Sequence, residues 1–355
     1  MALPGNRLPC GIKNYTYSRD MAIFRTKLHW GWLIAFMAFL LTMPLFVSAP
    51  FLRSVMSLMI TIVAVLGLHI IVGLCGQISL GQQAFMAVGG YAAAILATKF
   101  GLPFWVVVPS GGVIASMIGI IFGLPSLRIK GFYLAVSTLA AHFVIMYILI
   151  QWASVTGGDN GLKVQRPFLG PIDFASDQNF YYIILVTTVL LTFFAKNISR
   201  MAVGRAFIAI RDNDLAAEIM GINLFYYKLL AFAISSFFCG VAGALYTFYI
   251  TRADPVAWPL LNSVWQLGML IIGGIGSVMG VFFGAAFFKL LELMAAILGP
   301  AIVTIVPSFQ ASVAASLAEI LWGLAIVFSL VFEPRGINHR WEITKSLYRV
   351  WPFAY

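Results

Sequence analysis

The sequence predicts an all-α, polytopic membrane protein with about ten transmembrane spans. The 355-residue chain is 61% hydrophobic and only 10% charged, whereas soluble domains are roughly 45–50% apolar. Its apolar runs recur at about the length of 20 residues that a helix needs to cross a bilayer. The sequence shows no sign of a separate soluble domain.

Ten apolar runs follow one another along the chain, and each is interpreted as one span. They lie at about Trp30–Val47, Val55–Leu74, Ile78–Thr98, Phe104–Leu124, Phe132–Trp152, Phe180–Ala195, Leu229–Ile250, Val264–Val278, Val281–Leu298 and Val313–Phe332.

The basic residues predict the orientation. With both termini inside, 16 of the 22 Lys and Arg fall on the cytoplasmic side, as the positive-inside rule requires. An odd number of spans would place one basic tail outside. We therefore expect a cytoplasmic tail over residues 1–29, a membrane domain over 30–332 with a cytoplasmic loop at 196–228, and a second cytoplasmic tail over 333–355. No cleavage site follows a short apolar core, so the first tail is not interpreted as a signal peptide.

The net charge of +10 comes from these short basic segments and predicts no nucleic-acid partner. Cys10, Cys75 and Cys239 lack metal-ligand spacing, and we expect neither a metal site nor a catalytic cluster. No GxxxxGK[ST] sequence occurs. The chain therefore has no phosphate-binding loop of its own.

Gly204–Lys228 is a charged, helix-like island in this apolar chain. Asp212, Asn213 and Asp214 are candidate N-caps, and Gly221 can end a short helix in a left-handed conformation. A helix this short must pack against a neighbour. We interpret the island as a contact for a soluble partner; an ordinary solvated loop is the alternative. Its candidate residues are Arg205, Arg211, Asp212, Asp214, Ala216, Ala217, Glu218 and Gly221.

A polar, glycine-rich break interrupts the apolar sequence before the third span. Irregular backbone at membrane depth is tolerated only inside protein or beside a watery cavity. The break is interpreted as part of a translocation pathway, with close helix packing as the alternative. Its candidates are Gly76, Gln77, Ser79, Gly81, Gln82 and Gln83.

A second glycine group has the spacing of a packing motif. Gly276, Gly280 and Gly284 are spaced by four and follow Gly273 and Gly274. We expect this face to allow close helix approach.

Three charged residues lie in apolar runs, where charges are costly and often functional. Lys289 and Glu292 can pair on one helix face. Glu319 is a candidate for the translocation pathway, where it would meet a substrate amino group. His142, in the fifth run, is interpreted as a hydrogen-bonded core residue.

An outer loop opens at Thr156–Leu162 and carries Asp159, Asp173 and Asp177. Its glycines and Asp-Asn-Gly predict tight turns. We expect a structured loop that docks a binding protein; a plain connection is the alternative.

Five blocks in order resemble the longer of the two permease types of branched-chain amino acid ABC importers. The resemblance covers about Ile60 to Phe332. The blocks are GLCGQISLGQQAFMAVGGYAAAIL (73–96), LRIKGFYLAVSTLA (127–140), TGGDNGL (156–162), the island with LLAFAISSFFCGVAGALYTFYI (204–250) and LIIGGIGSVMGVFFGA (270–285). Ala216, Ala217 and Gly221 match the Ala-Ala-x-x-x-Gly core of the coupling loop, although Leu215 stands where other importer families have glutamate.

The resemblance implies a permease subunit that catalyses no covalent chemistry. It implies a second, homologous permease, two cytosolic P-loop ATPases that bind ATP and Mg, and an extracytoplasmic solute-binding protein. The expected location is a bacterial inner membrane, and the expected cargo is a branched-chain amino acid or a related urea, amide or aromatic acid.

The alternative is an ion-coupled secondary transporter without an ATPase, which would need a buried carboxylate near the substrate path. That alternative predicts that Glu319→Gln abolishes transport while damage to the island is tolerated. The importer hypothesis predicts the reverse.

Overall fold

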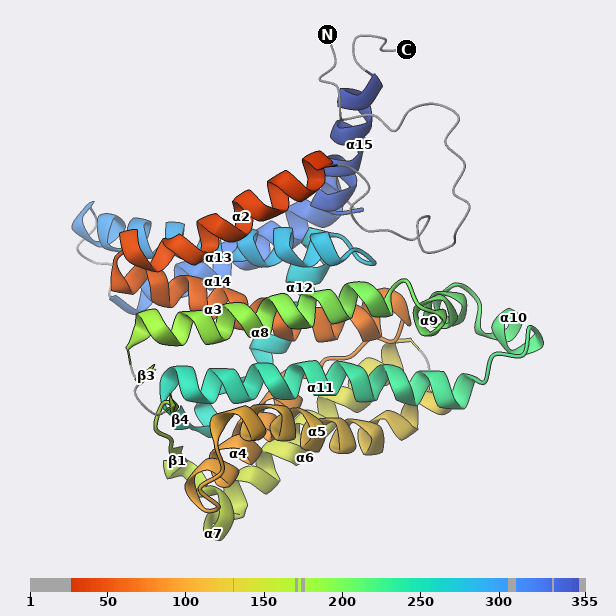
Figure 1. The fold of residues 1–355 in the computed structure, drawn as a ribbon. Helices are drawn as coiled ribbons and strands as arrows, with labels where there is room; N and C mark the ends of the chain where they lie inside the picture. The colour runs from red at the N-terminus through yellow and green to blue at the C-terminus, as the bar shows by residue number, and fades with distance from the viewer. Residues whose placement is uncertain are drawn as a thin grey trace.

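The computed structural model describes residues 27–129, 131–169, 172–173, 176–305, 311–333 and 335–350. Residues 1–26, and with them most of the expected N-terminal tail, lie outside this part. The described chain is mainly helical (Figure 1). The longer helices are α2 (Lys27–Phe46), α3 (Ala49–Leu68), α4 (Gln82–Thr98), α5 (Phe104–Gly123), α6 (Phe132–Gln151), α8 (Asp177–Ile198), α9 (Ala202–Asp212), α11 (Leu224–Ile250), α12 (Leu260–Gly273), α13 (Val278–Ile305), α14 (Ala311–Phe332) and α15 (Ile337–Val350).

The short elements connect these helices. One π-helical turn, η1 (His69–Leu74), continues α3, and α10 (Asp214–Ile219) joins α9 to α11. The others are η2 (Leu124–Leu127), α7 (Ala153–Thr156), η3 (Gly158–Asn160), β1 (Leu162–Lys163), β2 (Phe168–Leu169), β3 (Ile172–Asp173), β4 (Arg252–Ala253) and η4 (Pro255–Ala257).

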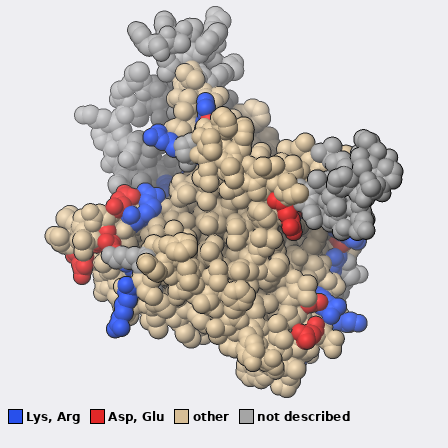
Figure 2. Space-filling model, turned by 180° about the vertical axis from the view of Figure 1, so that it is seen from behind, with Lys and Arg blue, Asp and Glu red and all other residues tan. Residues whose placement is uncertain are grey.

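Each of the ten predicted apolar runs overlaps a helix, but the eighth, Val264–Val278, begins four residues after the start of α12 and runs past its end at Gly273. Seven helices of the described chain are long and apolar enough to cross a membrane, and an eighth results if α14 and α15, bent by 49°, count as one span. The protein is therefore an all-α, multi-pass membrane protein. Figure 2 shows a broad uncharged surface, with charged residues near its left and right edges and a few near the top, as expected for a surface that faces lipid.

The third predicted run, Ile78–Thr98, begins too early. Residues 75–81 are not helical, and α4 starts only at Gln82. Gly76 has a φ of +71°, and the Gln77 N–H bonds the Ile71 carbonyl while the Gly76 N–H bonds the Val72 carbonyl. This glycine-dependent ending closes the preceding helix. Ile78 and Leu80 are therefore apolar without being helical.

Small residues bring the central helices together. Helix α11 lies against α3, α4 and α5. A Cβ added at Gly240 of α11 would lie 2.5 Å from the Ala115 Cβ and 2.8 Å from the Gly111 carbonyl oxygen of α5, and one added at Gly111 would lie 2.8 Å from the Gly89 carbonyl oxygen of α4. At these three positions the backbones are as close as glycine allows.

Helix α2 depends on a hydrogen bond from α8. Pro44 lies inside α2 and has no N–H to offer the Leu40 carbonyl four residues earlier. The Tyr181 hydroxyl donates to that carbonyl at 2.9 Å. The proline is thus compatible with a helix in an apolar environment.

Ion pairs stabilise the end of the molecule that carries β1 and β4. Strands β1 and β4 pair antiparallel, so the predicted outer loop is structured where it is described. Asp177 accepts hydrogen bonds from Arg53 at 2.6 Å and Arg166 at 2.7 Å. One carboxylate therefore links α3, α8 and the loop.

Replacing Gly240 with valine is expected to destabilise the bundle by about 1–3 kcal/mol, because the added side chain would meet the α5 backbone. Thermal unfolding of the purified protein in detergent measures this. Gly323→Val is the control, since a Cβ at Gly323 has nothing within 4 Å. Equal effects of the two substitutions would contradict the close contact.

Candidate coupling and translocation site

The charged island forms two helices, α9 and α10, joined by one extended residue. Asn213, between them, has φ of −161° and accepts a hydrogen bond from the Ala216 N–H through its side chain, which caps α10. Gly221 has a φ of +86°, the left-handed conformation expected from the sequence. The separate helix α9 was not predicted; its apolar stripe, with Phe207 and Ile210 buried, is its signal.

Contacts at its base hold α10 on the bundle. The Ala217 side chain is buried, and its carbonyl accepts the Ile222 N–H at 3.0 Å. The Asp214 carboxylate lies 3.6 Å from the ammonium of Lys228, a buried residue near the start of α11. The short helix is therefore fixed to the longer one by a partly buried ion pair.

The outer surface of α10 is apolar and exposed. Leu215, Ile219 and Met220 are 65%, 87% and 82% exposed. Figure 1 shows α10 standing away from the bundle at one end of the molecule. Exposed apolar side chains on a projecting, charged segment are typical of a protein contact. We call this surface the α10 tip.

Arg211 connects the island to the interior. Its Nη1 donates to the Gly73 carbonyl at 2.9 Å, and its Nε and Nη2 donate to Asp212 at 3.0 Å each. The Gly73 carbonyl lies in the last turn of η1, where helix carbonyls lack helical partners. Arg211 therefore replaces a missing backbone donor.

Three sequence-predicted groups meet around Arg211. A Cβ added at Gly76 would lie 2.6 Å from the Arg211 Cγ, and one at Gly276 would lie 3.4 Å from its Nη1. Gly76 was predicted for the pathway, Gly276 for packing and Arg211 for coupling. The structure brings all three together, and the Gly73 carbonyl, which accepts a hydrogen bond from Arg211, lies beside them.

The other residues of the polar break have separate environments. Gln77, Ser79, Gln82 and Gln83 are all buried. Gln82 Oε1 lies 2.7 Å from the Cys239 Sγ of α11. The backbone N–H groups of Leu80 and Gln83 donate to the hydroxyls of Thr138 and Ser263 at 2.9 and 3.1 Å, and a Cβ at Gly81 would lie 2.8 Å from the Thr138 carbonyl.

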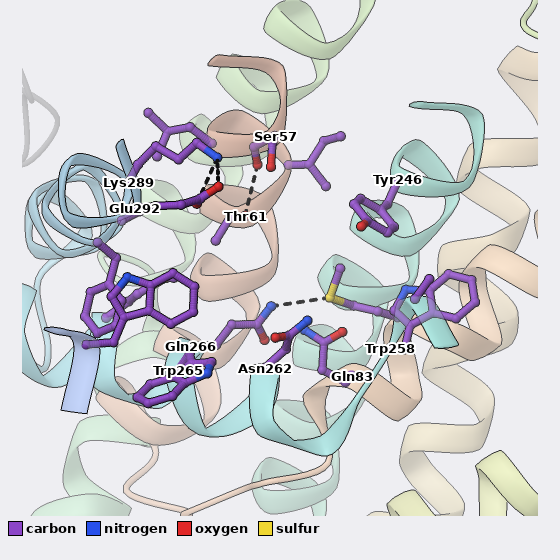
Figure 3. Close-up of a pocket in the computed structure, with 18 residues that line it drawn as sticks. Ser57, Thr61, Gln83, Tyr246, Trp258, Asn262, Trp265, Gln266, Lys289 and Glu292 are labelled. Carbon is purple, nitrogen blue, oxygen red and sulfur yellow. Dashed lines mark hydrogen bonds and ion pairs between the residues drawn. The ribbon is translucent and has the colours of Figure 1, made fainter. Parts of the chain in front are cut away.

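A cavity of about 160 Å³ lies beside the start of α4. Its walls come from α3, α4, α11, α12, α13 and α14 and from Ala257 and Trp258, which precede α12. Figure 3 shows Gln83, Asn262 and Gln266 gathered on one side, with Lys289 and Glu292 on another. Lys289 and Glu292 pair at 2.9 Å, which confirms the predicted pairing. His142 is buried, and its Nδ1 has no hydrogen-bond partner within the described chain, so the predicted bond is not found there.

The remaining predicted residues are not among those that line this cavity. A Cβ at Gly280 would lie 2.8 Å from the Gly273 carbonyl and 2.6 Å from that of Gly274, and Gly284 also faces Gly273 across the α12–α13 contact. Glu319 is exposed on α14 and is not among the cavity residues. Within the described chain, no His, Cys, Asp and Glu group suits a metal ion.

Most of the residues that line the cavity were not predicted from the sequence. In the sequence, Gln266 is a single polar residue within an apolar run and Asn262 a polar residue just before it, a pattern that does not indicate a site. Trp258 carried no signal, because an indole in a membrane protein is most often at an interface. Lys228, counted only for orientation, is the partner of Asp214.

Residues 51–330 match the family described as "Branched-chain amino acid transport system / permease component". The chain is 31% identical over 277 residues to the high-affinity branched-chain amino acid transport system permease protein LivM of Escherichia coli, a match that covers 71% of this chain and 65% of that protein. The same values hold for LivM of Salmonella typhimurium.

More distant similarity extends to a sugar permease. The chain is 26% identical over 223 residues to the ribose import permease protein RbsC of Haemophilus influenzae, covering 60% of this chain and 67% of that protein. No solved structure matches the chain. The chain spans about two thirds of the length of its LivM relatives, 65% in each case. With the family match over residues 51–330, it belongs to the permease-component family of branched-chain amino acid transport systems.

Proposed function

We propose that this chain is a membrane-spanning permease subunit of an ATP-driven importer that moves branched-chain amino acids into the cytoplasm. The observation that carries the proposal is the α10 tip, an exposed apolar surface on a segment fixed to the bundle by the Asp214–Lys228 pair. Family membership supports the same role, since the LivM relatives are named as branched-chain amino acid permeases. Related small polar solutes remain within the proposal.

The proposed complex contains a second homologous permease, two cytosolic P-loop ATPases and an extracytoplasmic binding protein. ATP and Mg would bind the ATPases, because this sequence has no phosphate-binding loop. We place the α10 end in the cytoplasm of a bacterial cell and the β1–β4 end outside the inner membrane. The outer end carries the structured loop held by Asp177, which suits a docking role.

We also propose ten spans with both termini inside. The ten spans are the seven helices that are long and apolar enough to cross a membrane together with α2, α4 and α14. These three helices have 20, 17 and 22 residues. Helix α4 needs no more residues, because the break before it provides part of the crossing.

The mechanism we propose is alternating access driven through Arg211. Closure of the ATPases would displace α10, and α9 would carry Arg211 with it. Because Arg211 donates to Gly73 and lies against Gly76 and Gly276, its movement would act on the end of α3 and on the α12–α13 connection. Other residues of α3, α12 and α13 line the cavity, so an ATPase-driven shift of these helices would open or close it. The ATPases and their nucleotides can drive this change only if they bind the two states of the permease with different affinities.

Replacing Ile219 with glutamate is expected to abolish ATPase binding without unfolding the bundle, because this side chain is almost fully exposed. Affinity purification of the tagged chain, with quantification of co-purifying ATPase, measures the effect, and we expect a loss of at least about tenfold, as for a charge placed in an interface core. Val256→Glu is the matched control, since Val256 is 83% exposed at the opposite end. Normal ATPase recovery with Ile219→Glu, together with normal uptake, would rule out the α10 tip as the contact.

Replacing Arg211 with glutamine is expected to separate ATPase binding from transport. The α10 tip stays intact, so the ATPase should co-purify, whereas loss of the Gly73 bond should reduce ATP-driven uptake by about tenfold or more. Uptake and ATP hydrolysis in proteoliposomes provide the two readings. Arg128→Gln, an exposed arginine between α5 and α6, is the control. Full uptake with Arg211→Gln would show that this contact does not transmit the movement.

A further inference from the structure

We propose that the cavity between α3, α4, α11, α12 and α13 binds the zwitterion of a small apolar amino acid during its passage through the protein. The inference rests on the proposed function and identifies a site for its substrate. The cavity of about 160 Å³ is close in size to an engineered cavity of about 150 Å³ that holds benzene. It therefore suits a solute with a short apolar side chain.

Buried polar atoms without partners point to a ligand on one wall. Gln266 is 5% exposed, and its Oε1 has no hydrogen-bond partner among the described residues. Its Nε2 has only the Met86 sulfur, at 3.5 Å. The Trp258 Nε1 is also buried and unpaired within the described chain. An unmet buried polar atom costs about 1–3 kcal/mol, so two such atoms on residues that line one cavity favour a polar occupant.

The start of α4 adds a field that favours a carboxylate. Gln83 and Met86, in its first turns, line the cavity. Gly81 precedes the helix and provides no side-chain cap. The partial positive charge of a helix N-terminus attracts anions, and the low surrounding polarity strengthens this attraction. Trp258, whose indole N–H is an unpaired donor within the described chain, also lines this cavity.

The Lys289–Glu292 pair supplies both charges that a zwitterion needs. At 1.5 Å per residue, Lys289 lies about 16 Å along α13 from Val278, well inside the span. The Lys289 ammonium can exchange Glu292 for the ligand carboxylate. Glu292 and the Gln266 Oε1 can then accept from the ligand ammonium. A ligand with only one charge would leave one member of the pair unmatched.

The apolar walls fit the remainder of the ligand. Trp265, Phe288 and Trp322 line the cavity together with Met269 and Ile60, and the Trp265 and Trp322 rings lie 5.2 Å apart. These side chains surround a volume suited to a branched aliphatic group. Polar groups and aromatic groups in one cavity thus match the two halves of such an amino acid.

The test uses the full chain in its assembled complex, with Cys10→Ser so that the remaining native cysteines are Cys75 and Cys239, which are both buried. Asn262→Cys is placed in the cavity and labelled with a water-soluble thiol reagent. L-Valine should slow labelling by about tenfold at saturation. Isovalerate and isobutylamine, which each carry one of the two charges, should not. Gln151→Cys, on an exposed residue at the end of α6, should label equally with and without L-valine.

Transport supplies the second reading. Gln266→Leu should reduce ATP-driven L-valine uptake by about tenfold while the ATPases still co-purify, and Gln151→Leu should not. Full uptake by Gln266→Leu with no protection of Asn262→Cys would overturn the site and leave the importer function intact. Protection by isovalerate alone would overturn the zwitterion. Absence of ATP-dependent uptake by the wild-type complex would overturn both the function and the site.

Discussion

The fold depends on one constraint: backbone groups freed from helices inside an apolar bundle must find other partners. Residues 75–81 leave the helical ladder, and their neighbours are satisfied from distant parts of the chain. Thr138 accepts from Leu80, Ser263 accepts from Gln83, and Arg211 donates to Gly73. Unmet backbone groups in such surroundings cost several kcal/mol each. The irregular segment is therefore as strongly specified as the helices around it.

The same constraint connects the proposed sites. The Thr138, Ser263 and Arg211 side chains come from α6, α12 and α9, so the break is the point at which these three helices are joined. One end of the break contacts the residue that links to the α10 tip. The other end starts α4 and borders the cavity. A segment of this kind can relate movement at the α10 end to access at the cavity without a continuous rigid helix.

Length and hydropathy in the sequence sufficed to predict the long apolar helices, though not all their ends, because an apolar run of span length has few other structures available in a membrane. The N-cap at Asn213 and the left-handed Gly221 were also predictable, since both are set by local chemistry. The hydrogen-bond partners of the break, Thr138 and Ser263, were not predictable, because they lie 58 and 180 residues away in the sequence. The cavity was missed for the same reason: Gln83, Gln266 and Lys289 are separated by many residues and become neighbours only through helix packing.

Helix α11 has a mechanical consequence. Its 27 residues extend about 40 Å, with Lys228 near one end and Tyr246, a wall of the cavity, towards the other. Glycines let α4 and α5 lie against its middle with little room to yield. The helix can therefore act as a lever whose pivot is the glycine contact at Gly240. A tilt of about five degrees about that pivot would move Tyr246, six residues from Gly240, by roughly 1 Å, by the rise of 1.5 Å per residue. Under the proposed mechanism, a rotation at the α10 end would therefore reach the wall of the cavity through this one helix.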